Sequence, residues 1–446
     1  MKNFTLILLT IVFAFSSSAS ELPPLTDLTK ITPLSQDCEN NNCVSLEESI
    51  ELARKNNFES RIDALRVYQA RQFIKVRVGQ LLPSFNLRIA SPLELFDYIP
   101  NLVGFLFPSN WFRLKESKMH AKAAEKSFLS LMANQINSTE SLYYNLHKET
   151  INLSLYKKHQ AYISKLKTVM EQREARGELQ PEEVEKAKLF LSDININEIT
   201  LSNALGELYP QMGYALNLPS VWNSFEIKSL ELPNLNDIEP IEFDSFFDEV
   251  VKKSYELQSI EYLKLAAKYS KKARYFEFLT PDSGTENAFG FGYLNSINIG
   301  KADQKIVEVQ GEMYNASLKE ALYKIVSNYN TSLELYAEAN NAIDSIEYIL
   351  ETIMEDFEIN SVIEFEEFKE MINENLYFQW MKNYAIHGYL LANAQLDRLL
   401  IKGDFYEDLE SLLPSKKKKK LKRYQRRENR KIDKAIKRGE LNPDLI

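Results

Sequence analysis

Charged residues recur every few positions among the apolar ones through most of the chain, and no apolar run reaches the about 18 residues that a membrane helix needs. Two stretches, Ser109–Arg176 and Glu312–His387, contain neither Gly nor Pro over 68 and 76 residues. Ordinary helices average about 11–12 residues. The pattern therefore predicts very long, water-exposed helices and excludes helical membrane spans.

The expected length of these helices indicates how they must pack. A helix from Arg113 to Arg176 would be about 95 Å long at a rise of 1.5 Å per residue. No single globular core covers such a rod, so it must lie against other long helices in a coiled coil or an α-helical cylinder. Gly177 suits the left-handed position after a helix, and Pro181 suits the first turn of the next one. The second long helix should reverse at 357–361, where Asn360 tolerates a positive φ.

The chain matches itself at an offset of 198 residues, which pairs Ile62 with Ile260 and Pro83 with Pro281. In both copies a helix of roughly 35 residues should end at the proline. A short insert, the very long helix and a further helix then follow. We therefore expect a first structural repeat over 45–220, a linker over 221–243 and a second repeat over 244–403.

The two inserts, 84–112 and 282–300, have a period of two. In the first, Phe85, Leu87 and Ile89 alternate with less apolar residues, and in the second aromatic residues alternate with Gly from Phe289 onward, with Ile297 and Ile299 following. Strands that face lipid or a barrel neighbour have this pattern. Short β-hairpins that cap helical hairpins in water are the alternative.

The second insert is short for a membrane hairpin. It has 19 residues, whereas two membrane strands need about 9–11 residues each. Either residues such as Tyr275–Leu279 join the strands, or any barrel is reduced.

Composition and charge narrow the class of protein. The 446 residues are 44% hydrophobic and 26% charged, which excludes wholesale disorder. The net charge of −9 includes a basic segment, 416–438, with 14 Lys and Arg against two acidic residues. An acidic body with a basic tail over 404–446 is unlike a nucleic-acid-binding domain. The tail could contact anionic lipid, peptidoglycan or an acidic partner, or serve only solubility.

The N-terminus has the pattern of an export signal. Residues 1–20 combine Lys2, an apolar run over Phe4–Phe15 and small residues up to Ser20, which is typical of a secretory signal peptide. The extension over 21–44 carries the only two cysteines, Cys38 and Cys43, which could close a small disulfide loop in an exported protein.

These features together resemble the TolC-like outer-membrane efflux protein family over roughly Ser45–Gly403. The resemblance rests on Ser45-Leu-Glu-Glu-Ser-Ile-Glu-Leu-Ala-Arg-Lys-Asn-Asn57, Gly79-Gln-Leu-Leu-Pro-Ser84, Arg176-Gly177, Ala204-Leu-Gly206 and Leu216-Asn-Leu-Pro219. None of these motifs is specific alone. The duplication, the helix lengths and the signal peptide make the set specific.

The resemblance implies a mainly α fold in which long helical hairpins form an α-barrel within a homotrimer, and the β-strand inserts form an outer-membrane β-barrel that is full or reduced. It implies an exit duct from periplasm to exterior for small molecules or proteins, working with a periplasmic adaptor (membrane fusion) protein and an inner-membrane pump in tripartite efflux or type I secretion. It implies no enzyme activity, cofactor, metal or nucleic acid. A periplasmic coiled-coil scaffold of the same fold, without a full pore, is the alternative.

The resemblance also suggests which residues meet partners. Arg176, Gly177, Asn360 and Ser361 would form the periplasmic tips that dock the adaptor, although a turn that merely reverses the chain needs the same residues. Threefold repetition of acidic residues before the second tip would give rings of negative charge that can select cations, while a solvated helix end is the simpler interpretation. Those acidic residues are Glu355, Asp356 and Glu358.

Overall fold

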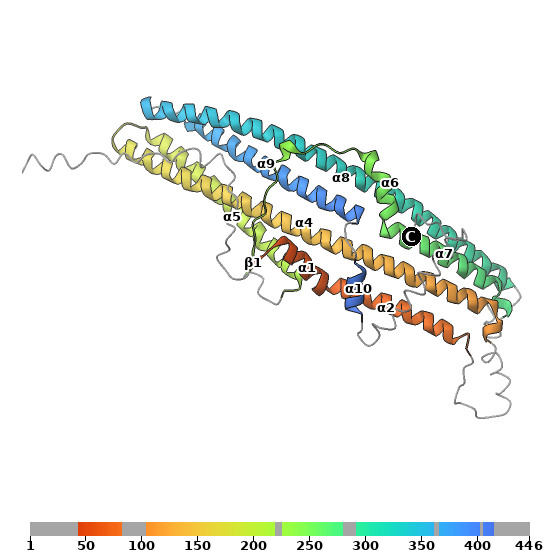
Figure 1. Ribbon diagram of the computed structural model, residues 1–446. Coiled ribbons are helices and arrows are strands. Elements are labelled where there is room, and N and C mark those ends of the chain that lie inside the picture. Colours follow the sequence, from red (N-terminus) through yellow and green to blue (C-terminus); the bar gives the residue numbers. More distant parts are fainter. Residues whose placement is uncertain are drawn as a thin grey trace, which may run out of the picture.

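Long antiparallel helices form an elongated layer in the computed structural model (Figure 1). The structure describes residues 43–82, 104–218, 225–279, 291–360, 365–401 and 405–413. Within these ranges no helix is both long and apolar enough to cross a membrane. The predicted mainly α fold with long helical hairpins is confirmed.

Four helices in one half of the chain recur in the same order in the other half. The first half has helices of 11, 22, 68 and 36 residues, and the second has helices of 11, 21, 70 and 36 residues. The first set is α1 (Leu46–Asn56), α2 (Phe58–Gly79), α4 (Pro108–Ala175) and α5 (Pro181–Leu216), and the second is α6 (Phe243–Lys253), α7 (Tyr255–Tyr275), α8 (Phe291–Asn360) and α9 (Phe365–Leu400).

Each half opens with two helices, where one helix of about 35 residues was expected. The side chain of Asn57 accepts hydrogen bonds from the backbone N–H groups of Glu59 and Ser60, at 2.8 and 3.2 Å, and so caps α2. Ser254 caps α7 in the same way through the N–H of Leu257, at 3.2 Å. The expectation was wrong because these polar side chains start a new helix inside an otherwise continuous helical pattern.

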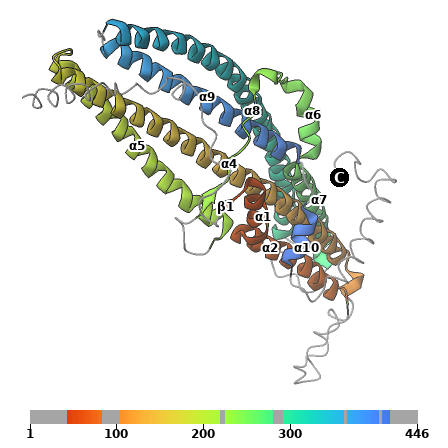
Figure 2. The ribbon, with the colours of Figure 1, turned by 60° about the vertical axis from the view of Figure 1, so that its left-hand side comes forward.

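The helix α4 lies in the middle of the layer. Helices α2 and α5 pack along one side of it, and α7 and α9 along the other, with α8 beyond α7 and α9. Figure 2 shows α4 between α5 and α9 in the half of the molecule that contains the chain reversals. Each long helix is thus flanked by two shorter helices placed end to end.

A small β-ladder ties the start of α1 to the segment between the two halves. Strand β1 (Cys43–Val44) pairs in parallel with β2 (Glu226–Ile227), and the 3-10 helix η4 (Leu235–Asp237) follows. The Tyr143 hydroxyl of α4 donates to the Lys228 carbonyl oxygen at 2.7 Å, which fixes this ladder to the long helix.

The described parts of both inserts are helical, so the strand expectation is wrong there. Residues 104–112 form the 3-10 helix η3 (Gly104–Leu106) and the start of α4, and residues 291–300 belong to α8. Tyr275–Leu279, which could have extended the second hairpin, ends α7 and forms the 3-10 helix η5 (Glu277–Leu279). The remaining insert residues, 83–103 and 280–290, lie outside the described residues.

The physical reason for the error in α8 lies in its glycines. A Cβ on Gly300 would come within 3.2 Å of the Lys271 Cα, and one on Gly311 within 3.3 Å of the Ile260 side chain. These glycines let α7 approach α8 closely, which is a helix-packing role. The strand prediction rested on Gly290 and Gly292 instead, which alternate with aromatic residues over too few positions to separate a strand from a helix.

The first residues after the second repeat are also part of the core, where a tail from 404 was expected. Helix α10 (Tyr406–Leu412) places Phe405, Leu409 and Leu413 in a buried cluster with residues of α2 and α4. The basic segment 416–438 lies outside the described residues.

Candidate docking tips and contact faces

The first tip is a Schellman turn between α4 and α5. Gly177 has φ of +74°, its N–H donates to the Glu174 carbonyl at 2.8 Å, and the N–H of Glu178 donates to the Arg173 carbonyl at 3.0 Å. Pro181 begins α5. The left-handed conformation predicted for Gly177 is confirmed, because this bond pattern requires a positive φ where a side chain would strain the backbone.

The second tip lies at the same end of the molecule as the first (Figure 1). Helix α8 ends at Asn360, and α9 begins at Phe365 after residues 361–364, which lie outside the described residues. Ser361 is among them. The predicted reversal over 357–361 is wrong for 357–360, because α8 continues through Asn360, and the change of direction falls between Asn360 and Phe365.

A shared apolar core holds the two tips together. One buried cluster collects residues of α4, α5, α8 and α9, and Phe190 of α5 meets Phe365 of α9 edge-on at a centroid distance of 6.4 Å. Leu179, in the first turn, packs against the same cluster. The tips are thus presented on a packed support.

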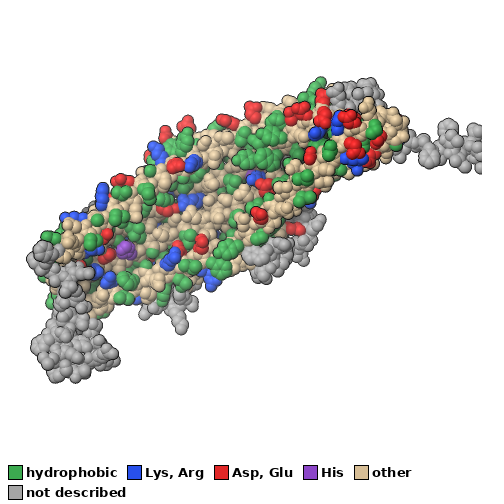
Figure 3. All heavy atoms as spheres, turned by 180° about the vertical axis from the view of Figure 1, so that it is seen from behind, with side chains coloured by type: hydrophobic (Ala, Val, Ile, Leu, Met, Phe, Trp, Pro, Cys, Tyr) green, Lys and Arg blue, Asp and Glu red, His purple; other side chains and the backbone are tan. Residues whose placement is uncertain are grey.

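The predicted acidic ring is only partly visible. Glu355 is exposed near the end of α8, whereas the side chains of Asp356 and Glu358 lie outside the described residues. Figure 3 shows acidic side chains gathered at this end of the molecule. The rings of negative charge that threefold repetition of these residues would give stay a prediction.

Cys43 begins β1 and is disulfide-bonded. Cys38 lies outside the described residues, so its pairing with Cys43 stays a prediction. Among the residues that the structure describes, no group of three or more His, Cys, Asp or Glu side chains could hold a metal ion.

The outer long helix, α8, carries an uncovered apolar stripe that the sequence analysis did not identify. Ile299, Ile306 and Met313 are seven residues apart, and Tyr348 continues this spacing. Heptad spacing keeps residues on one face of a supercoiled helix. Its members are 49–74% exposed. We name as the α8 seam Ile299, Ile306, Val309, Met313, Tyr323 and Tyr348.

The opposite edge of the layer carries a second stripe. It runs over α2 and α5, and the rings of Phe58 and Tyr214 join the two helices at a centroid distance of 6.4 Å. The central helix α4, in contrast, exposes one large apolar side chain, Trp111. We name as the α2–α5 seam Phe58, Ile62, Leu65, Phe73, Leu189, Ile196 and Tyr214, all of them exposed.

Comparisons with known proteins found similarity to solved structures only. No protein-family model and no curated protein matches the chain. The CmeC outer membrane channel of Campylobacter jejuni has 14% sequence identity and a TM-score of 0.67, with 86% of this chain and 94% of that chain covered.

Two further structures are similar. The outer membrane protein VceC of Vibrio cholerae has 11% identity and a TM-score of 0.65, covering 80% of this chain and 95% of that one. A membrane protein from Pseudomonas aeruginosa has 12% identity and a TM-score of 0.67, covering 80% and 90%. The chain therefore has the fold of these membrane proteins over most of its length.

Proposed function

We propose that the chain is one protomer of an outer-membrane exit duct, a TolC-like channel that passes small molecules or proteins from the periplasm to the exterior in tripartite efflux or type I secretion. The observation that carries the proposal is the shared fold with outer membrane channels over 86% of the chain. The signal-like N-terminus agrees with export, and most of the chain would lie in the periplasm. The function is transport without catalysis.

The two seams support a homotrimeric ring. Helix α4 is flanked on both sides by pairs of shorter helices, whereas α8 has such a pair, α7 and α9, on one side only. The α2–α5 seam of a second copy would supply the missing pair. Different surfaces would then meet at each contact, and such head-to-tail contacts close into rings when the rotation allows it.

The tips are the proposed docking site for a periplasmic adaptor, which would in turn bind an inner-membrane pump. Arg176 and Gly177 are exposed in the first tip, and Asn360 and Ser361 would stand beside them in the second. Photo-cross-linking from position 176, with position 55 on the exposed face of α1 as control, tests this. Adaptor cross-links from both positions, or from neither, contradict tip docking.

Membrane fractionation followed by planar-bilayer recording tests the duct itself. We expect the protein in the outer membrane, as a trimer, with conductance in the bilayer. A detergent-free soluble periplasmic protein that does not conduct would reject the duct.

One observation favours a second candidate, a periplasmic coiled-coil scaffold of the same fold. Between η5 and α8 the chain has 11 residues, 280–290, whereas two membrane strands need about 9–11 residues each. The scaffold predicts a soluble trimer without conductance, so the same experiment separates the two candidates.

A further inference from the structure

The end of the molecule opposite the tips exposes apolar side chains from both halves of the chain. The 3-10 helices η3 and η5 lie there, next to the first residues of α4 and the last residues of α7. Phe105 and Leu106 are 49% and 62% exposed, and Phe278 and Leu279 are 37% and 45% exposed. We name these four residues the apolar rim.

Ordered aromatic contacts hold the rim. The rings of Phe112 and Phe276 stack at a centroid distance of 5.7 Å, which joins the two halves. The Trp111 indole N–H donates to the Phe105 carbonyl at 2.8 Å. The Phe278 ring meets the Tyr293 ring edge-on at 5.5 Å. The exposed residues are therefore attached to a packed aromatic base.

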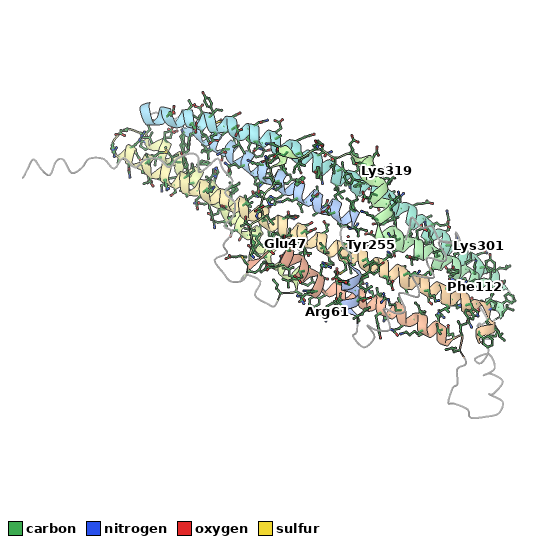
Figure 4. The ribbon with its side chains drawn as sticks, viewed as in Figure 1. Glu47, Arg61, Phe112, Tyr255, Lys301 and Lys319 are labelled. Atoms are coloured by element: carbon green, nitrogen blue, oxygen red, sulfur yellow. The ribbon has the colours of Figure 1, made fainter. Side chains whose placement is uncertain are left out.

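A concentration of positive charge surrounds this base. The ranges 71–82, 108–122, 264–279 and 291–305 contain fourteen Lys and Arg residues against three acidic ones. Two of the three acidic side chains are already paired, Glu277 with Arg113 and Asp303 with Arg274. We name this set of cations the basic collar. Figure 4 shows Phe112 and Lys301 at this end of the molecule.

The lysines of the collar lie beside the aromatic base. The ammonium groups of Lys115 and Lys272 lie 5.6 and 5.8 Å from the Phe112 ring centroid, and both side chains are exposed. A lysine in this position covers apolar surface with its stem while its charge stays in a polar layer. Aromatic and aliphatic side chains backed by Lys and Arg are typical of a surface that enters a lipid headgroup layer.

We propose that this end of the protein seats on an anionic phospholipid surface, with the apolar rim in the headgroup layer and the basic collar against the lipid phosphates. The proposal rests on the outer-membrane location proposed above and deepens it, because it names the residues that meet the bilayer. Charge complementarity selects the occupant. A second copy docked end to end would bring two basic collars together, which like-charge repulsion opposes.

Vesicle flotation of the full mature chain tests the proposal. The vesicles are phosphatidylcholine alone or phosphatidylcholine with phosphatidylglycerol. The collar variant is K115Q/K268Q/K272Q/K301Q, and the matched control is K55Q/K188Q/K253Q/K324Q, which removes the same charge from exposed lysines elsewhere. We expect the collar variant to bind the anionic vesicles at least about tenfold more weakly than the unchanged chain. The control variant should bind them as tightly as the unchanged chain.

A rim variant, F105S/L106S/F278S/L279S, tests the apolar part without removing charge. We expect weaker binding to the anionic vesicles with an unchanged helical circular dichroism spectrum. The proposal would be overturned if the chain bound both vesicle types equally, if the collar and control variants lost equal binding, or if the rim variant bound like the unchanged chain. Self-association of the chain that only the collar variant abolishes would also overturn it. Collar-dependent binding by a chain that never conducts would keep the lipid seat and reject the duct.

Discussion

The Nδ1 atom of His147 on α4 lies 2.9 Å from the Nε2 atom of His387 on α9, and both side chains are fully buried. The Leu230 N–H donates to His147 Nε2 at 3.1 Å, which places the His147 proton on Nδ1. His147 then donates to His387, whose Nδ1 donates to the Asn383 carbonyl at 2.9 Å. Two neutral rings satisfy this series of hydrogen bonds. A second proton on His147, at Nε2, would remove the acceptor of the Leu230 N–H, and one on His387, at Nε2, would remove the acceptor of the His147 N–H.

The histidine pair predicts loss of stability in mild acid. Burial lowers the pKa of His147 to about 4, and burial, with the positive charge of Lys148 nearby, lowers the pKa of His387 to about 3. Both pKa values lie below that of a histidine in an unfolded chain, which is about 6.5. As the pH falls, the unfolded state therefore takes up protons before the folded state does. The stabilisation is present above about pH 6.5 and is lost toward pH 4. For His147 alone it is on the order of 3 kcal/mol.

Urea unfolding at several pH values checks this, with His147→Gln as the variant. A glutamine can accept from Leu230 and donate to His387 without titrating. The free energy of unfolding of the variant should therefore fall less steeply between about pH 6.5 and 4, because about one proton fewer is taken up on unfolding. His120→Gln, on an exposed face of α4, should keep the original slope. The same slope in all three chains would contradict the assignment.

Glu256 and Arg398 form a largely buried ion pair between α7 and α9, and its disruption should be costly. Burial opposes ionisation of Glu256, but Arg398 and the Ser130 hydroxyl outweigh it, and the pKa of Glu256 is lowered. Ser130 donates to its carboxylate at 2.6 Å. Glu256→Gln leaves the Arg398 charge without its carboxylate, which should cost about 3–5 kcal/mol.

A double-mutant cycle with Arg398→Met measures the coupling. We expect the double variant to recover part of the loss, because no uncompensated buried charge remains. Strictly additive effects would show that the pair contributes nothing beyond its separate side chains. The exposed pair of Lys324 and Glu320 on α8 is the control, and we expect its coupling to be much weaker because water screens both charges.

Two truncations should separate the packed part of the C-terminal segment from the rest. Removal of 415–446 should leave the trimer and its thermal stability unchanged. Removal of 405–446 also deletes Phe405, Leu409 and Leu413, which cover buried residues of α2 and α4, and the ion pair of Asp408 with Arg54 at 2.7 Å. Several kcal/mol of stability should be lost. Equal melting temperatures for the two truncated chains would exclude a structural role for α10.

The sequence predicted the parts of the fold that local chemistry decides. Gly177 and Pro181 mark the first tip because a positive φ and a helix start each favour one residue type. The break at Asn57 was missed because a capping side chain resembles any other polar residue on a helix. The pairing of His147 with His387 could not be predicted, because the two residues are 240 positions apart in the chain. The seams could not be predicted either, because they depend on which faces of the helices are left uncovered after the helices pack.

The seams give the sharpest test of assembly. Ile306→Asp with Met313→Asp places two charges on the α8 seam, and Ile196→Asp places one on the α2–α5 seam. Each change should weaken the trimer at least about tenfold, because a buried, unpaired carboxylate costs several kcal/mol. The folded protomer should persist, since these side chains are exposed within it. Ile349→Asp, on α8 but outside the seam, is the matched control. Sedimentation velocity would measure the distribution of monomer and trimer, and a trimer that survives both seam variants would rule out head-to-tail closure through these faces.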